Sequence, residues 1–594
     1  MNKKEQKVTE DISHKHNNMR NITTLLFGCV ICLFWGLYYP YHLHYQEQLQ
    51  LFLFTPEYWA DKWTHPGGVA EYIAEFLTQF FFHPWAGAFT IAILLMIMQR
   101  LISQIAESLK APAIWYPLSF FPPLCIWIYL CDQNALLAMP VSLAFALLVW
   151  RGYQLLSSVP RWQILYTILI TPLLYWGIGG AFFLFVIGVT IDLCLPNRKL
   201  YLGAIVYVGL GISCPLSAQY FTQYPLLSLM TGIDYYRFPL TFPPTMVLAF
   251  TAIIFIPWIM KGLPPCKNFR KGLLLETALL LIGGLFGILW ASDTKREEVL
   301  KYDYLTYMNR WKEIIQIAEK KEPKSPFSVT CLNLALAKTG QLGDRMFHFY
   351  QNGTEGLIPQ FQRDCTSPLP TAEIFYHLGL INISQRYTFE AMEAIPDLKK
   401  SGRTYVRLAE TNLINGQYAV AAKYLHALQH TIFYRRWATN AMSYLYNKRK
   451  IAEHPEWGQL WKIQQDMEDC LFFDAEIVSM LGRLVQEEKG NYQMAFEYLL
   501  AYLLLDKDLE RFKKYYPWGK RLNYDHIPRS YQEALIFMRA EENPDFQKLP
   551  WTISDEVLDG IKEFTRIYMT REDPEPYLRP KFEKTYWYYL LFRK

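Results

Sequence analysis

The sequence predicts an all-α protein in two parts, a polytopic membrane bundle of about nine helices followed by an α-solenoid of helical repeats. Apolar runs recur up to Asp293 and are broken only by short basic or aromatic loops, whereas charged residues occur every few positions after it. The chain of 594 residues is 52% hydrophobic and 16% aromatic, yet its mean hydropathy is only +0.02. One very apolar part joined to an ordinary polar part explains both values.

Nine apolar runs have about the length that crosses ~30 Å of hydrocarbon. They cover residues 22–40, 84–104, 115–131, 135–150, 163–176, 180–195, 201–220, 244–260 and 273–292. The first run is not a cleaved signal peptide, because a polar tail precedes it and bulky residues follow it in place of a small-residue cleavage site. The predicted domains are a tail over 1–21, a transmembrane domain over 22–292 and a polar domain over 293–594.

Basic residues gather on one side of this bundle if residues 163–195 form two helices that turn at Trp176 to Gly180. They lie in the N-terminal tail and in loops near residues 100–110, 151–161, 198–199 and 261–271. The opposite short loops carry only Lys62 and Arg237. Positive residues favour the cytoplasmic side, so we expect a cytoplasmic tail and an extracytoplasmic domain over 293–594. A partial or tilted hairpin over 163–195 stays open.

Three stretches of the polar half, beginning at Tyr376, Val406 and Ser479, repeat one pattern. Each has a leucine before a small residue, an aromatic about ten positions later and then an alanine: Leu378–Gly379, Tyr387 and Ala391; Leu408–Ala409, Tyr418 and Ala421; Leu481–Gly482, Tyr492 and Ala495. Small residues let paired helices approach, which is typical of tetratricopeptide (TPR)-like repeats. Such an array presents a concave surface to a protein partner; a rigid cap on the membrane domain is the alternative.

The outer loop over 41–83 carries the first candidate site. The sequence predicts two helices here, an amphipathic interfacial one around 45–63 and a second from Pro66 onward. Glu47, with His44 and Gln48 beside it, would lie near the start of the first helix. Glu47 is therefore either a solvated carboxylate favoured at a helix N-terminus or a general base.

Two further outer loops offer candidate residues. Asp132, in the turn Cys131 to Asn134, either caps the following helix or joins Glu47 as a base, a cation ligand or a substrate clamp. Arg237, flanked by Tyr235 and Tyr236, either holds a lipid phosphate or anchors the loop at the interface. No histidine pair has metal-ligand spacing, so no metal site is assigned; a divalent cation remains the open cofactor.

Other function classes find no support in the sequence. No hydrolase, kinase or nucleotide-binding signature occurs in a usable context. The net charge of +5 is small and spread along the chain, so we expect no nucleic-acid partner.

Four stretches carry a resemblance over nearly the whole chain: "HYQEQLQLFLFTPEYW", "PGGVAEYIAEFLTQFF", "SVTCLNLALAKTGQLGDRMF" and "RLAETNLINGQY". They resemble a family of multi-span proteins from Bacteroidota to which no reaction is assigned. The resemblance implies a bacterial inner-membrane protein. With the nine predicted spans, its C-terminal domain would lie in the periplasm.

The layout of 22–292 also looks like the GT-C class of glycosyltransferases, which use polyprenyl-phosphate sugars outside the cytoplasm. In that class one acid lies early in the first outer loop and a second acidic motif lies between spans three and four. Glu47 and Asp132 stand at these places, although glutamate replaces the usual aspartate and the second motif has a single acid.

That likeness implies a transferase with Glu47 and Asp132 as catalytic residues and His44, Gln48, Tyr235, Tyr236 and Arg237 as substrate-binding residues. Its TPR-like domain would recruit the acceptor or a partner protein. Topology alone does not establish function. The alternative is a non-catalytic membrane scaffold whose TPR-like domain binds envelope proteins.

Overall fold

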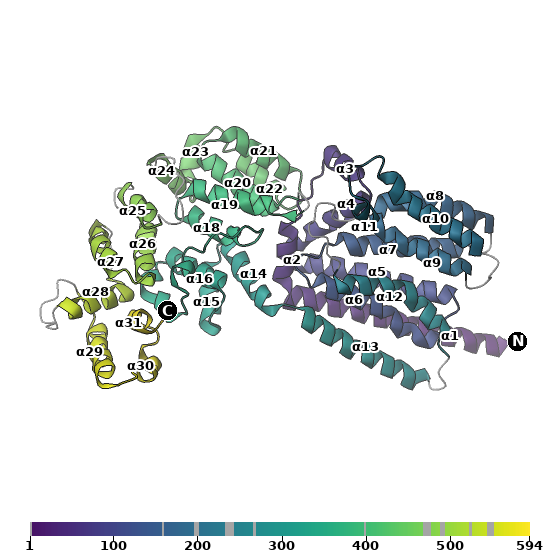
Figure 1. Cartoon of the computed structure of the whole chain (residues 1–594), viewed down its shortest axis with the longest axis horizontal. Coiled ribbons are helices and arrows are strands. Elements are labelled where there is room, and N and C mark those ends of the chain that lie inside the picture. Colours follow the sequence, from purple (N-terminus) through teal and green to yellow (C-terminus); the bar gives the residue numbers. More distant parts are fainter. Residues whose placement is uncertain are drawn as a thin grey trace. The chain divides into compact units, whose positions relative to one another are not determined.

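The computed structural model describes residues 3–156, 160–194, 201–231, 243–264, 269–396, 399–466, 477–487, 493–521, 526–542 and 552–593. The regular structure in these ranges is helical, which confirms the all-α class (Figure 1). The chain divides into two units. Unit 1 contains residues 1–297 with two short segments, 396–402 and 429–435, and unit 2 contains residues 298–395, 403–428 and 436–594.

Unit 1 is a helical bundle in which α5 contacts α1, α7 and α12. Its core positions Ile91, Leu95, Met98 and Ile102 recur every three or four residues and are fully buried, as one face of an α-helix requires. Proline stands in the first turn of α2, α3, α5 and α12, where no intrahelical donor is lost. The elements are α1 (Lys3–Leu33), η1 (Phe34–Tyr38), α2 (Pro40–Gln48), α3 (Pro56–Trp63), α4 (Gly68–Thr78), η2 (Gln79–Phe82), α5 (Pro84–Ser108), η3 (Ala113–Phe120), α6 (Phe121–Leu130), α7 (Ala138–Leu155), α8 (Pro160–Ile178), η4 (Gly179–Ala181), α9 (Phe182–Cys194), α10 (Tyr201–Ala218), α11 (Leu226–Thr231), α12 (Pro244–Gly262) and α13 (Phe269–Ala291).

Five helices in the described part of the chain are long and apolar enough to cross a membrane, which indicates a membrane protein. They are Asn18–Tyr38, Pro84–Ser108, Ala113–Leu130, Arg161–Cys194 and Pro244–Gly262. This number is smaller than the nine predicted. The described apolar parts of α10 and α13 are shorter, Leu202–Ala218 and Leu280–Ala291, and α7 ends in the polar stretch Arg151 to Gln154.

The fourth of these stretches, Arg161–Cys194, is broken where the sequence predicts a turn. α8 ends at Ile178, and Gly179 has φ +62° before α9 starts at Phe182. Glycine adopts this left-handed conformation at little cost. The structure therefore has two helices over 160–194 in place of one continuous helix.

The outer loop differs from the prediction of one helix over 45–63. α2 stops at Gln48, the chain runs without a helix to Thr55, and α3 then begins at Pro56. Thr55 caps α3 by accepting a hydrogen bond from the backbone N–H of Tyr58 at 3.2 Å. The second predicted helix is present as α4, which starts at Gly68.

The break in the outer loop has a tertiary cause. The backbone N–H of Leu51 donates to the carbonyl oxygen of Lys400 at 2.8 Å, and that of Phe54 donates to the carbonyl oxygen of His430 at 2.8 Å. These donors bind the two segments that join unit 1 from far along the chain. An amphipathic pattern in residues 45–63 could not reveal such partners.

Unit 2 consists of successive helices, and neighbours α15 and α16, α18 and α19, and α25 and α26 pack as pairs (Figure 1). Its elements are α14 (Thr294–Tyr307, which begins in unit 1), α15 (Trp311–Lys320), α16 (Pro326–Lys338), α17 (Leu342–Arg345), η6 (Met346–His348), η7 (Gly353–Gly356), α18 (Pro368–His377), α19 (Ile381–Glu393), α20 (Gly402–Ile414), α21 (Tyr418–Gln429), α22 (Arg435–Met442), α23 (Lys448–Glu453), α24 (Trp457–Asp466), α25 (Ile477–Glu487), α26 (Gln493–Leu505), α27 (Leu509–Tyr515), η10 (Tyr516–Arg521), α28 (Arg529–Glu542), α29 (Asp555–Thr570), α30 (Glu575–Phe582) and α31 (Tyr586–Phe592).

The structure places the residues of the predicted repeat pattern at unequal positions in their helices. Ala391, Ala421 and Ala495 are buried on α19, α21 and α26. The leucine–small pairs are not equivalent: Leu408–Ala409 and Leu481–Gly482 lie inside helices, whereas Leu378–Gly379 forms a turn in which Gly379 has φ +79°. Tyr492 lies outside the described residues. The first stretch is therefore out of register with the others.

Candidate functional site

The candidate site in unit 1 is built around α2, a polar helix whose residues from His42 to Gln48 are all buried. Buried polar groups need hydrogen-bond partners. The ring Nε2 of His42 lies 3.1 Å from the carbonyl oxygen of Leu130. Glu297 accepts from the backbone N–H groups of Tyr41 and His42 at 2.8 and 3.0 Å, so a carboxylate satisfies donors at the N-terminus of α2.

Glu47 lies in the last turn of α2, not near a helix start, and is not solvated. The residue is 6% exposed. The Tyr434 hydroxyl, from the segment 429–435, lies 3.1 Å from each carboxyl oxygen. Burial raises the pKa of Glu47 to about 8 although the hydrogen bond from Tyr434 acts to lower it. Glu47 is therefore a buried acid whose pKa burial shifts upward, out of the usual carboxyl range.

Asp132 lies in the turn between α6 and α7, beside α2. The side-chain Nε2 of Gln46 donates to the carbonyl oxygen of Ala135 at 3.0 Å and contacts that of Asp132 at 3.5 Å. The Asp132 carboxylate is exposed, and its Oδ1 accepts from the backbone N–H of Asn134 at 2.8 Å. The fold thus brings the turn next to α2. The carboxyl group of Glu47 still binds Tyr434, and that of Asp132 binds the backbone of Asn134.

The other predicted site residues divide into two groups. His44 and Gln48 are buried on α2, and burial, with a smaller contribution from His83, lowers the pKa of His44 to about 4. Tyr235, Tyr236 and Arg237 lie outside the described residues. Within the described ranges, no group of three or more His, Cys, Asp or Glu residues is placed to hold a metal ion.

A second buried cluster in unit 1 was not expected from the sequence. The Lys62 ammonium lies 2.9 Å from Glu71 and 3.0 Å from Glu75, and that of Lys399 lies 3.3 and 3.6 Å from the same oxygens. Tyr58 donates to Glu75. Burial acts to raise the pKa of Glu71, but Lys399 and Lys62 outweigh it and lower that pKa to about 2; burial and Glu71 raise the pKa of Glu75.

One sequence signal could have pointed to this cluster. Glu71 and Glu75 are four residues apart on a mostly apolar helix, "GVAEYIAEFLT", so they share one helix face. Acids in that setting need cationic partners. Lys399 could not be found this way, because it is more than 300 positions away along the chain.

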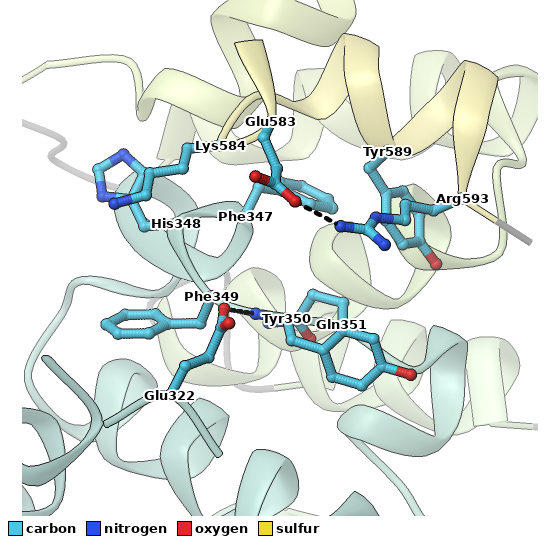
Figure 2. Close-up of a pocket in the computed structure, with 10 residues that line it drawn as sticks. All are labelled: Glu322, Phe347, His348, Phe349, Tyr350, Gln351, Glu583, Lys584, Tyr589 and Arg593. Atoms are coloured by element: carbon cyan, nitrogen blue, oxygen red, sulfur yellow. Dashed lines mark hydrogen bonds and ion pairs between the residues drawn. The ribbon is translucent and has the colours of Figure 1, made fainter. Parts of the chain in front are cut away.

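Unit 2 contains a cavity of about 130 Å³ between the residues after α17 and the end of the chain. Figure 2 shows that the lining residues Glu583 and Arg593 pair with each other and that Glu322 bonds to the backbone of Tyr350. Arg593 donates to Glu583 at 2.8 Å, and Glu322 accepts from the backbone N–H of Tyr350 at 2.5 Å. Small size and mixed charge give this cavity no evident ligand class.

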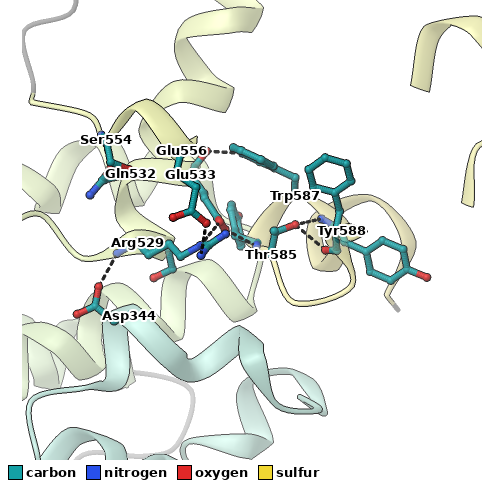
Figure 3. Close-up of polar contacts among 12 residues, drawn as sticks. Asp344, Arg529, Gln532, Glu533, Ser554, Glu556, Thr585, Trp587 and Tyr588 are labelled. Carbon is teal, nitrogen blue, oxygen red and sulfur yellow. Dashed lines mark hydrogen bonds and ion pairs between the residues drawn. The ribbon is translucent and has the colours of Figure 1, made fainter. Parts of the chain in front are cut away.

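A polar network next to that cavity joins α28 to the last helices of unit 2 (Figure 3). Glu533 is 1% exposed and accepts from Arg529 Nε at 3.0 Å and from the backbone N–H of Tyr586 at 2.6 Å. The indole N–H of Trp587 donates to the Glu533 carbonyl oxygen at 2.7 Å. Burial raises the pKa of Glu533 to about 7. These contacts serve packing, since each group bonds to the chain itself.

The α2 site is therefore the candidate with the clearest chemistry, and the comparisons with known proteins do not assign it a reaction. No curated protein and no solved structure matches the chain. A family model described as "Family of unknown function (DUF6057)" matches residues 15–593. The chain belongs to this family.

Proposed function

We propose that this protein is an envelope transferase that moves a sugar from a polyprenyl-phosphate carrier to an acceptor hydroxyl at Glu47. One observation carries the proposal: a buried carboxyl group with a pKa of about 8 receives a hydroxyl, that of Tyr434, at 3.1 Å from both oxygens. A general base works best when its pKa lies near the operating pH. The raised pKa and a hydroxyl held against both carboxyl oxygens support the proposal that Glu47 takes a proton from an acceptor.

In the proposed reaction an acceptor hydroxyl takes the place of the Tyr434 hydroxyl. Its oxygen attacks the anomeric carbon of the sugar, its proton passes to Glu47, and the bond from that carbon to the carrier phosphate breaks. The buried Gln50 supports a polar ligand here, because its Oε1 has no hydrogen-bond partner among the described residues. Positioning and a base together lower the barrier of such a transfer.

The remaining roles follow the same proposal. Asp132, exposed in the turn beside α2, is free to contact the sugar, and Tyr235, Tyr236 and Arg237 would hold the carrier phosphate. Within the described residues no group of three or more His, Cys, Asp or Glu is placed to hold a divalent cation.

The proposed membrane topology has nine crossings in a bacterial inner membrane, with the N-terminus in the cytoplasm and unit 2 in the periplasm. The five long helices and the shorter apolar ones support it in part. In this arrangement the helical pairs of unit 2 act as a TPR-like surface that recruits the acceptor. Protease added to spheroplasts should digest unit 2; protection of unit 2 would overturn the topology.

The test compares envelope glycans in cells that carry Glu47→Gln, Asp132→Asn or the exposed control Glu57→Gln at equal membrane levels. Glu47→Gln keeps the size and a hydrogen-bonding oxygen but cannot take a proton, so glycans should change as in a deletion strain. Asp132→Asn should give a partial change, and Glu57→Gln none. If the deletion changes the glycans and Glu47→Gln does not, the transferase proposal is wrong.

A non-catalytic scaffold is the second candidate, and a separate observation favours it. The outer loop holds the segments 396–402 and 429–435 by backbone hydrogen bonds, by the Lys399 ion pairs and by Phe433 stacked on Phe82 at 5.0 Å. Glu47 would then be one of several residues that hold these segments in place. Loss of a co-purified envelope protein on deletion of unit 2, with glycans unchanged, would favour this role.

A further inference from the structure

A groove between α1 and α5 lies far from the α2 site along both helices, and most of the residues that line it are apolar. It encloses about 510 Å³ and is lined by Asn21 and Leu25 from α1 and by Ile93, Met96, Ile97 and Arg100 from α5, among others. Leu25, Ile93 and Ile97 are 61%, 51% and 48% exposed. Both helices belong to candidate membrane spans, Asn18–Tyr38 and Pro84–Ser108. Hydrocarbon chains are therefore the natural neighbours of these side chains.

One end of the groove carries a positive charge that no acid neutralises within the described part of the chain. Arg100 donates to the side-chain oxygen of Asn21 and forms no ion pair there. Arg20, one position before Asn21, contrasts with it, because Arg20 is paired with Glu107. A guanidinium at the edge of the membrane core is costly without a counter-charge. A phosphate group supplies that charge and fits the two parallel donors of arginine.

The walls at this end of the groove are fixed by buried hydrogen bonds. The Thr24 hydroxyl lies 3.0 Å from Gln99 Oε1 and 2.8 Å from the Tyr116 hydroxyl, and Gln99 Nε2 donates to the Ser119 hydroxyl at 2.7 Å. These bonds join α1 to α5 and both helices to η3, at positions next in sequence to Arg100 and one turn from Asn21. The binding groups are thus held in place before any ligand arrives, which favours affinity.

We propose that this groove binds an anionic phospholipid, with its phosphate on Arg100 and Asn21 and one acyl chain along Leu25, Ile93 and Ile97. In the proposed orientation this is a lipid of the cytoplasmic leaflet. The inference goes beyond the transferase function and does not depend on it, since the groove shares no residue with the α2 site.

The test measures lipid binding to the purified full chain in neutral detergent by native mass spectrometry. The probes are phosphatidylglycerol, phosphatidylcholine with the same acyl chains, and inorganic phosphate. Phosphatidylglycerol should bind more tightly than phosphatidylcholine, and Arg100→Gln should weaken phosphatidylglycerol binding about tenfold by loss of a charge-assisted pair. The matched control Arg151→Gln, at the end of α7, should leave binding unchanged.

A second variant tests the apolar part of the groove independently of the charge of Arg100. Ile97→Trp fills the apolar groove and keeps Arg100, so it should also weaken phosphatidylglycerol binding. Equal binding of the two lipids to the wild type, wild-type affinity in Arg100→Gln, or competition by inorganic phosphate as strong as by the lipid would each overturn the proposal. Envelope glycans in Glu47→Gln cells test the transferase separately.

Discussion

Glu47→Gln should change how stability depends on pH. In the folded chain burial holds the pKa of Glu47 at about 8, against an ordinary value of 4.5. Between these pH values the folded state keeps a proton that the unfolded state has lost. Stability therefore falls as pH rises through this window, because the native state binds more protons than the unfolded state there. The variant removes this dependence.

The size of the effect follows from the two pKa values. Each pH unit between them is worth about 1.4 kcal/mol, so the interval from 4.5 to about 8 spans at most about 5 kcal/mol. At pH 5 the glutamine replaces a protonated acid of nearly equal shape, and the two proteins should be close in stability. At pH 8 the variant should be the more stable protein by several kcal/mol.

The assay is thermal unfolding of both full-length proteins in the same detergent at pH 5, 6, 7 and 8. Glu533 and Glu410 also have pKa values raised by burial, to about 7, but both proteins contain them, so the difference between the two midpoints isolates Glu47. A midpoint difference that stays constant from pH 5 to pH 8 would refute the argument that burial raises the pKa of Glu47.

Two further changes test other parts of unit 1 by thermal unfolding of the full chain in detergent. Lys399→Met removes a positive charge from beside Glu75, which is 1% exposed, and should lower the free energy of unfolding by about 3–5 kcal/mol. The control Lys320→Met, at an exposed position, should change it by less than about 0.5 kcal/mol. Equal effects would contradict the buried cluster. Gly179→Ala forces a side chain onto φ +62° and should cost about 1–2 kcal/mol. The control Gly177→Ala lies inside α8 with open space around the added carbon and should leave stability unchanged or raise it. If Gly179→Ala does not lower stability, the left-handed turn at Gly179 is wrong.

Local signals in the sequence predicted local structure well. The turn at Trp176 to Gly180 was predicted from glycine content and charge distribution, and the chain breaks at Gly179. The helix over 45–63 was wrong because Leu51 and Phe54 bond to residues more than 300 positions away. Amphipathic periodicity records which side chains avoid water but not which distant backbone pairs with a segment.

The candidate site shows the same limit. The position of Glu47 after an apolar run identified it as a candidate, yet its environment depends on Tyr434, which is 387 positions away. In the sequence Lys62 is one of two basic residues in the outer short loops; in the structure its ammonium lies against the carboxylates of Glu71 and Glu75. Tertiary contacts determine the chemistry of both residues, and the spacing of residues in a single sequence does not reveal such contacts.

The most direct test of the central claim measures polyprenyl-phosphate-linked sugars in membranes, because a transferase that lacks its base leaves its donor unused. Cells with Glu47→Gln at wild-type protein levels should accumulate the same lipid-linked sugar as the deletion strain, and cells with Glu57→Gln should match the wild type. A wild-type pool in Glu47→Gln cells, beside an altered pool in the deletion strain, would contradict the account.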